Sequence, residues 1–270
     1  MKKYAVIGNP VHHSLSPMIH AQFAEQFGLS ISYEKILSPL GDFAKDSKNF
    51  IASGGLGFNI TLPYKVNAYE FCSKLTLNAE VAGAVNTIKV ESNEIIGDNT
   101  DGIGLVNDFK NNLQQSFEGK EVLIIGAGGA TQGILKPILD CNPEKILLAN
   151  RTKEKSLKLS QKFSKYGKVC GFGLDQIKAK SVDIVINATS ASLDGKMPEI
   201  TGGVAQGAFC YDLMYGDETP FMKWAKENSA SKVSDGLGML VEQAASSFTF
   251  WHSKTPDTKE VIKLIRAKVD

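Results

Sequence analysis

A glycine-rich loop between an apolar run and a helix-like stretch constrains the fold of this chain more than any other feature. Residues 121–125 predict a buried strand, and residues 126–130 (Gly-Ala-Gly-Gly-Ala) follow it directly. Gly126 permits a tight turn, and Gly128 lets a diphosphate approach the backbone because no Cβ stands in the way. The helix start that follows favours an anion. The loop therefore predicts a dinucleotide-binding α/β domain. An ordinary strand–turn–helix corner is the alternative, because Gly129 departs from the G-x-G-x-x-G spacing.

The residues about 20 positions beyond the glycines indicate which dinucleotide fits. NAD-binding folds place an acidic residue there for the ribose hydroxyls, whereas this chain has Asn150, Arg151 and Thr152. A carboxylate would repel a 2′-phosphate, but a guanidinium beside a hydroxyl and an amide binds one through charge-assisted hydrogen bonds. The pattern predicts NADP as the cofactor.

Length and composition limit the class of protein. A chain of 270 residues predicts about two domains. The net charge of +1 provides no field that would recruit nucleic acid or a membrane. No apolar stretch reaches the roughly 18 residues of a transmembrane helix, and Gly8-Asn9-Pro10 ends the first apolar run too early for a signal peptide. We expect a small-molecule substrate and neither nucleic acid nor a membrane as partner.

The cysteines and histidines follow no metal-ligand pattern. The cysteines are scattered without a C-x-x-C pair, and the histidines have no recognised spacing. Scattered thiols are typical of a reducing compartment. We therefore expect a cytoplasmic protein without a metal. The four cysteines are Cys72, Cys141, Cys170 and Cys210.

Short β-rich runs alternate with helical periodicity along the chain, which predicts an α/β protein with parallel sheets. A hairpin-like turn at Ser92 and Asn93 joins two of the strands. The helix expected from Gly102 ends in the polar run 111–116, so we place a domain boundary near residue 101. The expected strands are 4–7, 31–37, 57–60, 86–90, 94–97, 122–125, 145–149, 168–171, 183–187, 208–212 and 232–234.

Two Ser/Thr-Pro pairs predict helix starts. Ser16 with Pro17 predicts an N-cap and first helical residue, as does Thr255 with Pro256 near the C-terminus. Capping alone accounts for Ser16 but not for Ser14. Two hydroxyls at a strand–helix junction would also suit a carboxylate or a polyol.

Lys65 is the best local candidate for acid–base chemistry. Hydride transfer to or from a carbonyl needs a group that moves the hydroxyl proton, and the chain has no Tyr-x-x-x-Lys pattern. Lys65 stands in the expected first turn of a helix, where the dipole disfavours a cation, and Asn59 and Thr61 lie just before it. A solvated surface lysine is the alternative. Asp98 or Asp101 could be a plain N-cap, but either carboxylate beside Lys65 would orient it.

Nine motifs along the chain resemble, in order, those of the shikimate dehydrogenases, the NADP-dependent enzymes of aromatic amino-acid biosynthesis. The motifs are SLSP at 14, NITLPYK at 59, AVNT at 84, GDNTDG at 97, GAGGA at 126, NRT at 150, INATS at 186, YDLMY at 211 and DGLGMLVEQAA at 235. The resemblance covers nearly the whole chain. It implies two α/β domains that flank a cleft. Residues 1–101 and 237–270 would bind shikimate, and residues 102–236 would form a Rossmann-like NADP domain.

The resemblance also implies a role for individual residues. The catalytic pair would be Lys65 and Asp101. The substrate-binding positions would be Ser14, Ser16, Asn59, Thr61, Asn86, Tyr215 and Gln243. The cofactor-binding positions would be Gly126, Ala127, Gly128, Gly129, Ala130, Asn150, Arg151, Thr152, Lys155, Thr189, Leu213 and Gly236. Many relatives have arginine in place of Lys155. The lysine keeps the positive charge but lacks the forked guanidinium that can donate two parallel hydrogen bonds to a phosphate.

The implied reaction is the reversible NADPH-dependent reduction of 3-dehydroshikimate to shikimate. Lys65 would protonate or stabilise the developing alkoxide, and Asp101 would orient Lys65 and bind a ring hydroxyl. Which of the two carries the proton stays open. The alternatives are a broader quinate/shikimate dehydrogenase that often uses NAD, and a non-catalytic NADP-binding sensor of the same fold. Another two-domain NADP enzyme would lack the substrate-side motifs. A monomer and a homodimer both fit the sequence.

Overall fold

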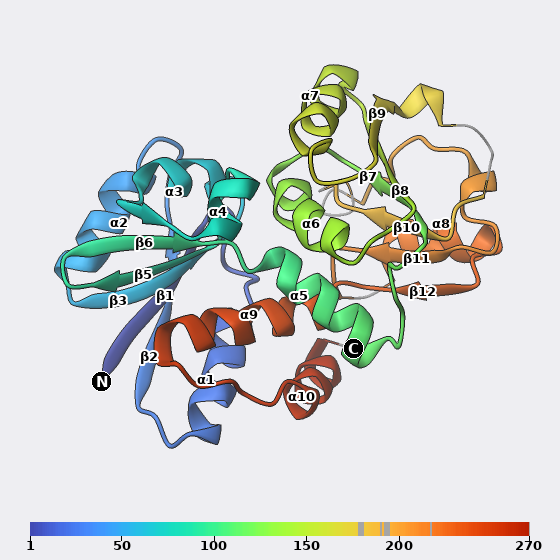
Figure 1. Ribbon diagram of the computed structural model, residues 1–270. Coiled ribbons are helices and arrows are strands. Elements are labelled where there is room, and N and C mark those ends of the chain that lie inside the picture. The colour runs from blue at the N-terminus through green and yellow to red at the C-terminus, as the bar shows by residue number, and fades with distance from the viewer. Residues whose placement is uncertain (178–180, 190, 192–194, 217, 270) are drawn as a thin grey trace. The chain divides into compact units, whose positions relative to one another are not determined.

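The computed structural model describes residues 1–177, 181–189, 191, 195–216 and 218–269, and they form two compact α/β units (Figure 1). The first unit contains Met1–Leu105 and Leu240–Ile265, and the second contains Val106–Met239 and Arg266–Asp270. The predicted α/β class is confirmed. Among the described residues, no helix combines the length and the apolar character needed to cross a bilayer.

The first unit is built on a mixed sheet in the order β2-β1-β3-β5-β6-β4. Its strands are β1 (Lys2–Gly8), β2 (Ile31–Leu37), β3 (Gly55–Ile60), β4 (Lys74–Leu75), β5 (Thr87–Glu91) and β6 (Glu94–Asp98). Its helices are α1 (Ser16–Gln26), α2 (Phe43–Ala52), α3 (Lys65–Phe71), α4 (Leu77–Ala82) and most of α9 (Leu237–His252). Helix α5 (Asp101–Asn107) begins in this unit and is followed by a π-helical turn at Asp108–Asn112.

The prediction of parallel sheets is wrong for this unit. Strand β1 pairs in parallel with β2 and β3, but β5 runs antiparallel to both β3 and β6. The predicted turn at Ser92 and Asn93, whose φ angles are 49° and 68°, forms a tight hairpin and accounts for the antiparallel pair of β5 and β6. Strand β4 was not predicted, because two residues are too short for a periodicity to appear.

Apolar side chains cover both faces of this sheet. On one face Phe50 and Phe58 pack with Tyr64, which begins the α3 turn. On the other face Trp251 of α9 stacks on Tyr4 of β1, and its indole N–H donates to the Ile88 carbonyl. Each fully buried aromatic side chain contributes roughly 1.5–3 kcal/mol to the stability of this unit.

The second unit has a sheet in the order β12-β11-β10-β7-β8-β9, and every strand pairing made by its described residues is parallel. Counted from β7 this is the strand order 3-2-1-4-5-6 of dinucleotide-binding folds, which reverses between β7 and β10. The strands are β7 (Glu121–Ile125), β8 (Lys145–Asn150), β9 (Val169–Gly173), β10 (Ile184–Asn187), β11 (Phe209–Asp212) and β12 (Lys232–Ser234). The helices are α6 (Gly129–Asp140), α7 (Lys153–Phe163) and α8 (Pro220–Glu227), with 3₁₀ turns at Leu174–Gln176 and Gly202–Val204.

Two predicted helix starts are wrong in detail. Helix α1 begins at Ser16 itself, with Leu15 as its N-cap and no capping hydrogen bond from a side chain. The last helix, α10 (Lys259–Val269), begins after Thr255 and Pro256 rather than at them. The Asp257 carboxylate instead accepts the N–H of Lys259 and starts the helix there.

Candidate active site

Lys65 and Asp101 form an ion pair at the starts of two helices in the first unit. Lys65 is the first residue of α3, and its Nζ lies 2.5 Å from Oδ2 of Asp101, the first residue of α5. The two side chains are 16% and 7% exposed. A lysine at a helix N-terminus is disfavoured by the dipole, and the carboxylate offsets this effect. The pair therefore presents an oriented ammonium with donors left for a ligand.

Asn86 connects this ion pair to the neighbouring polar side chains. Its Nδ2 donates to Asp101 Oδ1 at 2.8 Å and to Gln243 Oε1 of α9 at 3.3 Å. Its Oδ1 accepts the Thr100 N–H at 2.9 Å. The structure thus brings together Lys65, Asn86, Asp101 and Gln243, which lie far apart in the sequence.

The sheet topology explains why these residues meet at one edge. Strands β1 and β3 are parallel, so Ser14 and Ser16 after β1 and Thr61 after β3 leave the sheet at the same side. Because β5 is antiparallel to β3, Asn86 precedes β5 at that same side. Strand β6 returns antiparallel to β5 and delivers the loop that ends at Asp101. The unpredicted antiparallel strands therefore help to assemble the site.

Ser14 rather than Ser16 shapes the turn before α1. The Ser14 Oγ accepts the Ser16 N–H at 3.3 Å and donates to the Ser16 Oγ at 3.1 Å. The prediction that Ser16 caps the helix is wrong, because it already belongs to the helix. The two hydroxyls lie side by side, as recognition of a carboxylate or polyol requires.

Asn59 is buried, and its hydrogen-bonding groups are engaged within the protein. Its Oδ1 accepts from the Tyr33 hydroxyl at 2.7 Å, and its Nδ2 donates to Thr87 Oγ1 and Ser247 Oγ, each at 3.0 Å. Sequence reasoning missed Tyr33, Thr87 and Ser247. Thr87 is the last residue of the AVNT motif and is the one member that a motif could have indicated.

The glycine loop of the second unit leaves β7 at the point where the strand order reverses. Gly126 has φ +111°, and a Cβ there would lie 3.0 Å from the Ala188 carbonyl oxygen. A Cβ on Gly128 would meet nothing within 4 Å. Gly128 is also the N-cap of α6 and offers no side chain to the helix amides. The start of α6 therefore has the open approach that a diphosphate requires.

Asn150 ties the basic segment to the glycine loop. Its Oδ1 accepts the Ala127 N–H at 3.1 Å, and its Nδ2 donates to the Thr152 carbonyl at 2.8 Å. Thr152 is the N-cap of α7, but its hydroxyl makes no capping hydrogen bond. The side chains of Arg151 and Lys155 are exposed beside it. This arrangement fits a 2′-phosphate near the glycine loop.

The remaining predicted cofactor residues follow the carboxyl ends of β10, β11 and β12. Thr189 Oγ1 donates to Asn187 Oδ1 at 2.8 Å, and Asn187 Nδ2 donates to Asp212 Oδ1 at 3.0 Å. A Cβ on Gly236 would collide with the carbonyl oxygen of Leu213. Gly236 is therefore needed for packing as well. Ser190 of the INATS motif lies outside the described residues.

Tyr215 also belongs to the second unit. Its side chain is partly buried, and burial raises the pKa of its phenol. A neutral phenol at working pH can donate a hydrogen bond.

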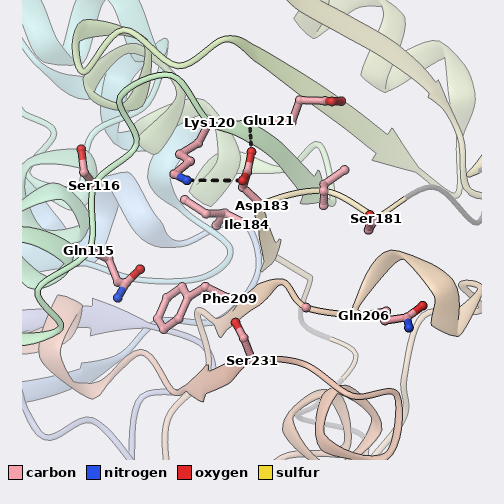
Figure 2. Close-up of a pocket in the computed structure, with 12 residues that line it drawn as sticks. Gln115, Ser116, Lys120, Glu121, Ser181, Asp183, Ile184, Gln206, Phe209 and Ser231 are labelled. Carbon is pink, nitrogen blue, oxygen red and sulfur yellow. Dashed lines mark hydrogen bonds and ion pairs between the residues drawn. The ribbon is translucent and has the colours of Figure 1, made fainter.

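A pocket lies at the opposite edge of this sheet, where β7, β10 and β11 begin (Figure 2). Its volume is about 450 Å³. Lys120 and Asp183 point toward one another on one side of it, with Nζ and Oδ1 3.4 Å apart, and Asp183 Oδ2 accepts the Glu121 N–H at 2.9 Å (Figure 2). Ligands of open parallel sheets bind outside the carboxyl ends of the strands. The glycine-loop edge, rather than this pocket, therefore suits a dinucleotide.

The described residues contain no group of three or more His, Cys, Asp or Glu side chains arranged to hold a metal ion. The four cysteines are free thiols, and burial raises the pKa of Cys72 and Cys210 to about 12. Hydride chemistry with a lysine–aspartate pair requires no metal ligand set.

Three family profiles match the chain in succession. Residues 6–88 match the shikimate dehydrogenase substrate binding domain, residues 109–194 match shikimate / quinate 5-dehydrogenase, and residues 236–266 match the shikimate 5'-dehydrogenase C-terminal domain. A curated relative from Ruthia magnifica subsp. Calyptogena magnifica, named shikimate dehydrogenase (NADP(+)), is 58% identical over 267 residues. The match covers 99% of this chain and 100% of that protein.

Solved structures of similar proteins cover nearly the whole chain as well. An Ael1 enzyme from Pseudomonas putida has a TM-score of 0.90 and 38% identity, with 98% of each chain covered. Shikimate 5-dehydrogenase from Thermus thermophilus, solved in complex with NADP(H) and shikimate, has a TM-score of 0.87 and 30% identity, with 99% of each chain covered.

Proposed function

The chain belongs to the shikimate dehydrogenase family, and from this premise we propose that it catalyses the reversible NADPH-dependent reduction of 3-dehydroshikimate to shikimate. The observation that carries the proposal is the Lys65–Asp101 ion pair, which lies beside Asn86 and Gln243. A hydroxylated ring acid presents the hydroxyls and the carboxylate that such a set of donors and acceptors can bind.

NADPH, when bound, supplies the hydride for the ketone carbon. The Lys65 ammonium would then donate a hydrogen bond to the ketone oxygen and stabilise the negative charge that develops there. Asp101 would hold Lys65 in place and accept a hydrogen bond from a ring hydroxyl. The 2.5 Å distance between Lys65 Nζ and Asp101 Oδ2 supports these two roles, because a donor that is already oriented needs no reorganisation during the reaction.

The proposed substrate site includes the two serine hydroxyls and the residues around the ion pair. Ser14 and Ser16 would bind the carboxylate, assisted by Tyr215 and Gln243. Their adjacent hydroxyls, 3.1 Å apart, support this assignment. The remaining proposed substrate residues are Asn59, Thr61 and Asn86.

The proposed cofactor site follows the glycine-loop edge of the second unit. The diphosphate would lie against residues 126–130, and Arg151, Thr152 and Lys155 would bind the 2′-phosphate. Asn150 would position that segment through its hydrogen bond to Ala127. Thr189, Leu213 and Gly236 would border the nicotinamide half, since they follow the neighbouring strands β10, β11 and β12.

The domain roles and the cellular setting belong to the same proposal. Residues 1–101 and 237–270 would be the substrate domain, and residues 102–236 the cofactor domain. The free cysteines suit the reducing cytoplasm. The enzyme would act there as a monomer or a homodimer without nucleic acid or membrane partners. Light scattering on the purified enzyme tests the oligomeric state.

Steady-state kinetics with shikimate and quinate, each with NADP and NAD, test the proposed function. We expect the highest kcat/KM for the pair of shikimate and NADP. Quinate turnover with NAD at a comparable kcat/KM would support the broader quinate/shikimate dehydrogenase instead. NADP binding without any turnover would support a non-catalytic sensor. Arg151 disfavours the first alternative, and the presence of both Lys65 and Asp101 disfavours the second.

A further inference from the structure

A chain of buried hydrogen bonds leads from Tyr33 to the ion pair. The Tyr33 hydroxyl donates to Asn59 Oδ1 at 2.7 Å, and Asn59 Nδ2 donates to Thr87 Oγ1 at 3.0 Å. Thr87 Oγ1 then donates to Asn86 Oδ1 at 2.9 Å, and Asn86 Nδ2 donates to Asp101 Oδ1 at 2.8 Å. This series of hydrogen bonds therefore ends at the Asp101 carboxylate, which holds Lys65.

In this series, every hydrogen bond is donated in the direction from Tyr33 toward Asp101. The Asp101 carboxylate can only accept, so the amide group of Asn86 must face it with its NH₂. The Asn86 oxygen must then accept, and the Thr87 hydroxyl supplies one of its donors. The Asn59 amide is fixed in the same way between Thr87 and Tyr33. Each hydroxyl thus adds to the contacts that fix which way an amide of the proposed substrate site is turned.

Burial makes this arrangement costly to change. Thr87 is 0% exposed and Asn86 is 2% exposed, so water can hardly replace a lost partner. Ser247 of α9, also buried, accepts from Asn59 Nδ2 at 3.0 Å and lies 2.7 Å from Thr87 Oγ1. An amide that loses its hydroxyl partner would be held less firmly, although Asn86 Oδ1 would keep the Thr100 N–H and Asn59 Nδ2 would keep Ser247 Oγ.

Tyr33 is the first residue in this series of hydrogen bonds. Its ring stacks on His20 with centroids 4.7 Å apart, which fixes where its hydroxyl points. That hydroxyl donates to Asn59 Oδ1 at 2.7 Å. The same tyrosine thus holds the Asn59 amide from a fixed position.

We propose that Tyr33 and Thr87 are positioning residues for the substrate site: their hydroxyls orient Asn59 and Asn86, and through Asn86 they orient the Asp101 carboxylate toward Lys65. This inference rests on the proposed function for its effect on turnover, although the orientation itself is a property of the folded chain. Neither residue needs to touch the substrate.

Thr87→Val removes the hydroxyl and keeps the shape of the side chain, and Thr87→Ser restores the hydroxyl. We expect kcat for shikimate to fall about 2- to 10-fold in Thr87→Val, the range for the net loss of one hydrogen bond, while KM for NADP stays unchanged. Thr87→Ser should recover most of kcat. Equal losses in both variants, or wild-type kcat in Thr87→Val, would overturn the role of Thr87.

Tyr33→Phe and the matched control Tyr4→Phe test the other end. Both tyrosines belong to the aromatic cluster around Trp251, but only Tyr33 reaches Asn59. We expect Tyr33→Phe to raise KM for shikimate about 10-fold or more, with the Tm of the two variants similar. The same KM change in Tyr4→Phe, or none in Tyr33→Phe, would overturn the role of Tyr33.

Hydrogen exchange at the Thr100 amide gives a readout that does not depend on activity. This N–H donates to Asn86 Oδ1, so a loosened Asn86 should expose it. We expect at least 10-fold faster exchange in Thr87→Val than in Tyr4→Phe. If exchange is faster in Thr87→Val but the wild-type enzyme does not turn over shikimate, the proposed function is refuted. The positioning role still stands in that case. Unchanged exchange would overturn the positioning role.

Discussion

Lys65 Nζ lies 2.5 Å from Asp101 Oδ2, although 36 residues separate the two in sequence. Each residue begins a helix, α3 and α5, and the two helix starts meet at one edge of the sheet. A helix N-terminus disfavours a cation by about 0.3–1 kcal/mol and favours an anion by a similar amount. The helix N-terminus thus stabilises the negative charge of Asp101 and destabilises the positive charge of Lys65. The Lys65 ammonium therefore depends on the Asp101 carboxylate for its stabilisation.

Arg151→Ala should weaken NADP use selectively. The exposed guanidinium follows Asn150, which is tied to the glycine loop. Loss of one or two charge-assisted hydrogen bonds costs about 1.5–3 kcal/mol, so KM for NADP should rise about 10- to 150-fold while NAD use changes little. Lys158→Ala, on helix α7 that follows Arg151, is the control. Equal losses with NADP and NAD would exclude a role in binding the 2′-phosphate.

Ser14→Ala and Ser16→Ala should both raise KM for shikimate about 10-fold. They should differ in stability, because the Ser14 Oγ accepts the Ser16 N–H whereas the Ser16 side chain caps nothing. We expect a lower Tm for Ser14→Ala only, equivalent to about 1 kcal/mol. Thermal unfolding and steady-state kinetics measure the two effects. An unchanged KM in both variants would remove these serines from the substrate site.

Gly128→Ala and Gly236→Ala should separate cofactor binding from packing. A Cβ on Gly128 meets open space, so its Tm should not change, but KM for NADP should rise where the diphosphate approaches. A Cβ on Gly236 collides with the Leu213 carbonyl oxygen, which should cost about 1–3 kcal/mol of stability. A stable Gly128→Ala enzyme with wild-type KM for NADP would place the diphosphate elsewhere.

His20 should make the protein less stable in acid. Burial is the main cause that lowers its pKa, to about 3, against a smaller opposing effect of the Asn59 side chain. Between the ordinary histidine pKa of 6.5 and about 3, the unfolded chain binds a proton that the folded protein excludes. The free energy of unfolding therefore falls as the pH falls through this window, by up to about 1.4 kcal/mol per pH unit.

Urea unfolding of wild type and His20→Phe at pH 7 and pH 5 isolates this contribution. The phenylalanine ring keeps the stacking on Tyr33 and cannot be protonated. We expect the wild type to lose about 2 kcal/mol more than the variant between the two pH values. Equal losses would show that His20 is protonated in the folded state over this range.

Much of the fold was predictable because its local signals are strong. The apolar run before the glycine loop and the turn at Ser92 and Asn93 depend on neighbouring residues alone. The antiparallel placement of β5 beside β3 was not predictable, because strand pairing is decided by contacts distant in sequence. The two-residue strand β4 has no periodicity to detect.

The candidate site shows the same division. The pairing of Lys65 with Asp101 was implied by the resemblance, whereas the local sequence left open whether Asp98, Asp101 or neither lies beside Lys65. The roles of Tyr33 and Ser247 were hidden, because a buried hydroxyl in a strand or helix has no distinctive sequence pattern. Ser16 was wrongly assigned as a cap, since Ser-Pro at a helix start fits the cap and the first helical position equally well.

The most direct test of the account is kcat for shikimate oxidation by NADP in Lys65→Ala, Asp101→Asn and the double variant, followed at the NADPH absorbance band. We predict that kcat falls roughly 10²–10⁴-fold in Lys65→Ala, with a much smaller change in KM, and that kcat also falls in Asp101→Asn. The double variant should have a kcat little lower than that of the worse single variant, because coupled residues act as a unit. Near-wild-type kcat in Lys65→Ala, or fully additive losses in the double variant, would contradict the assignment of the proton chemistry to this pair.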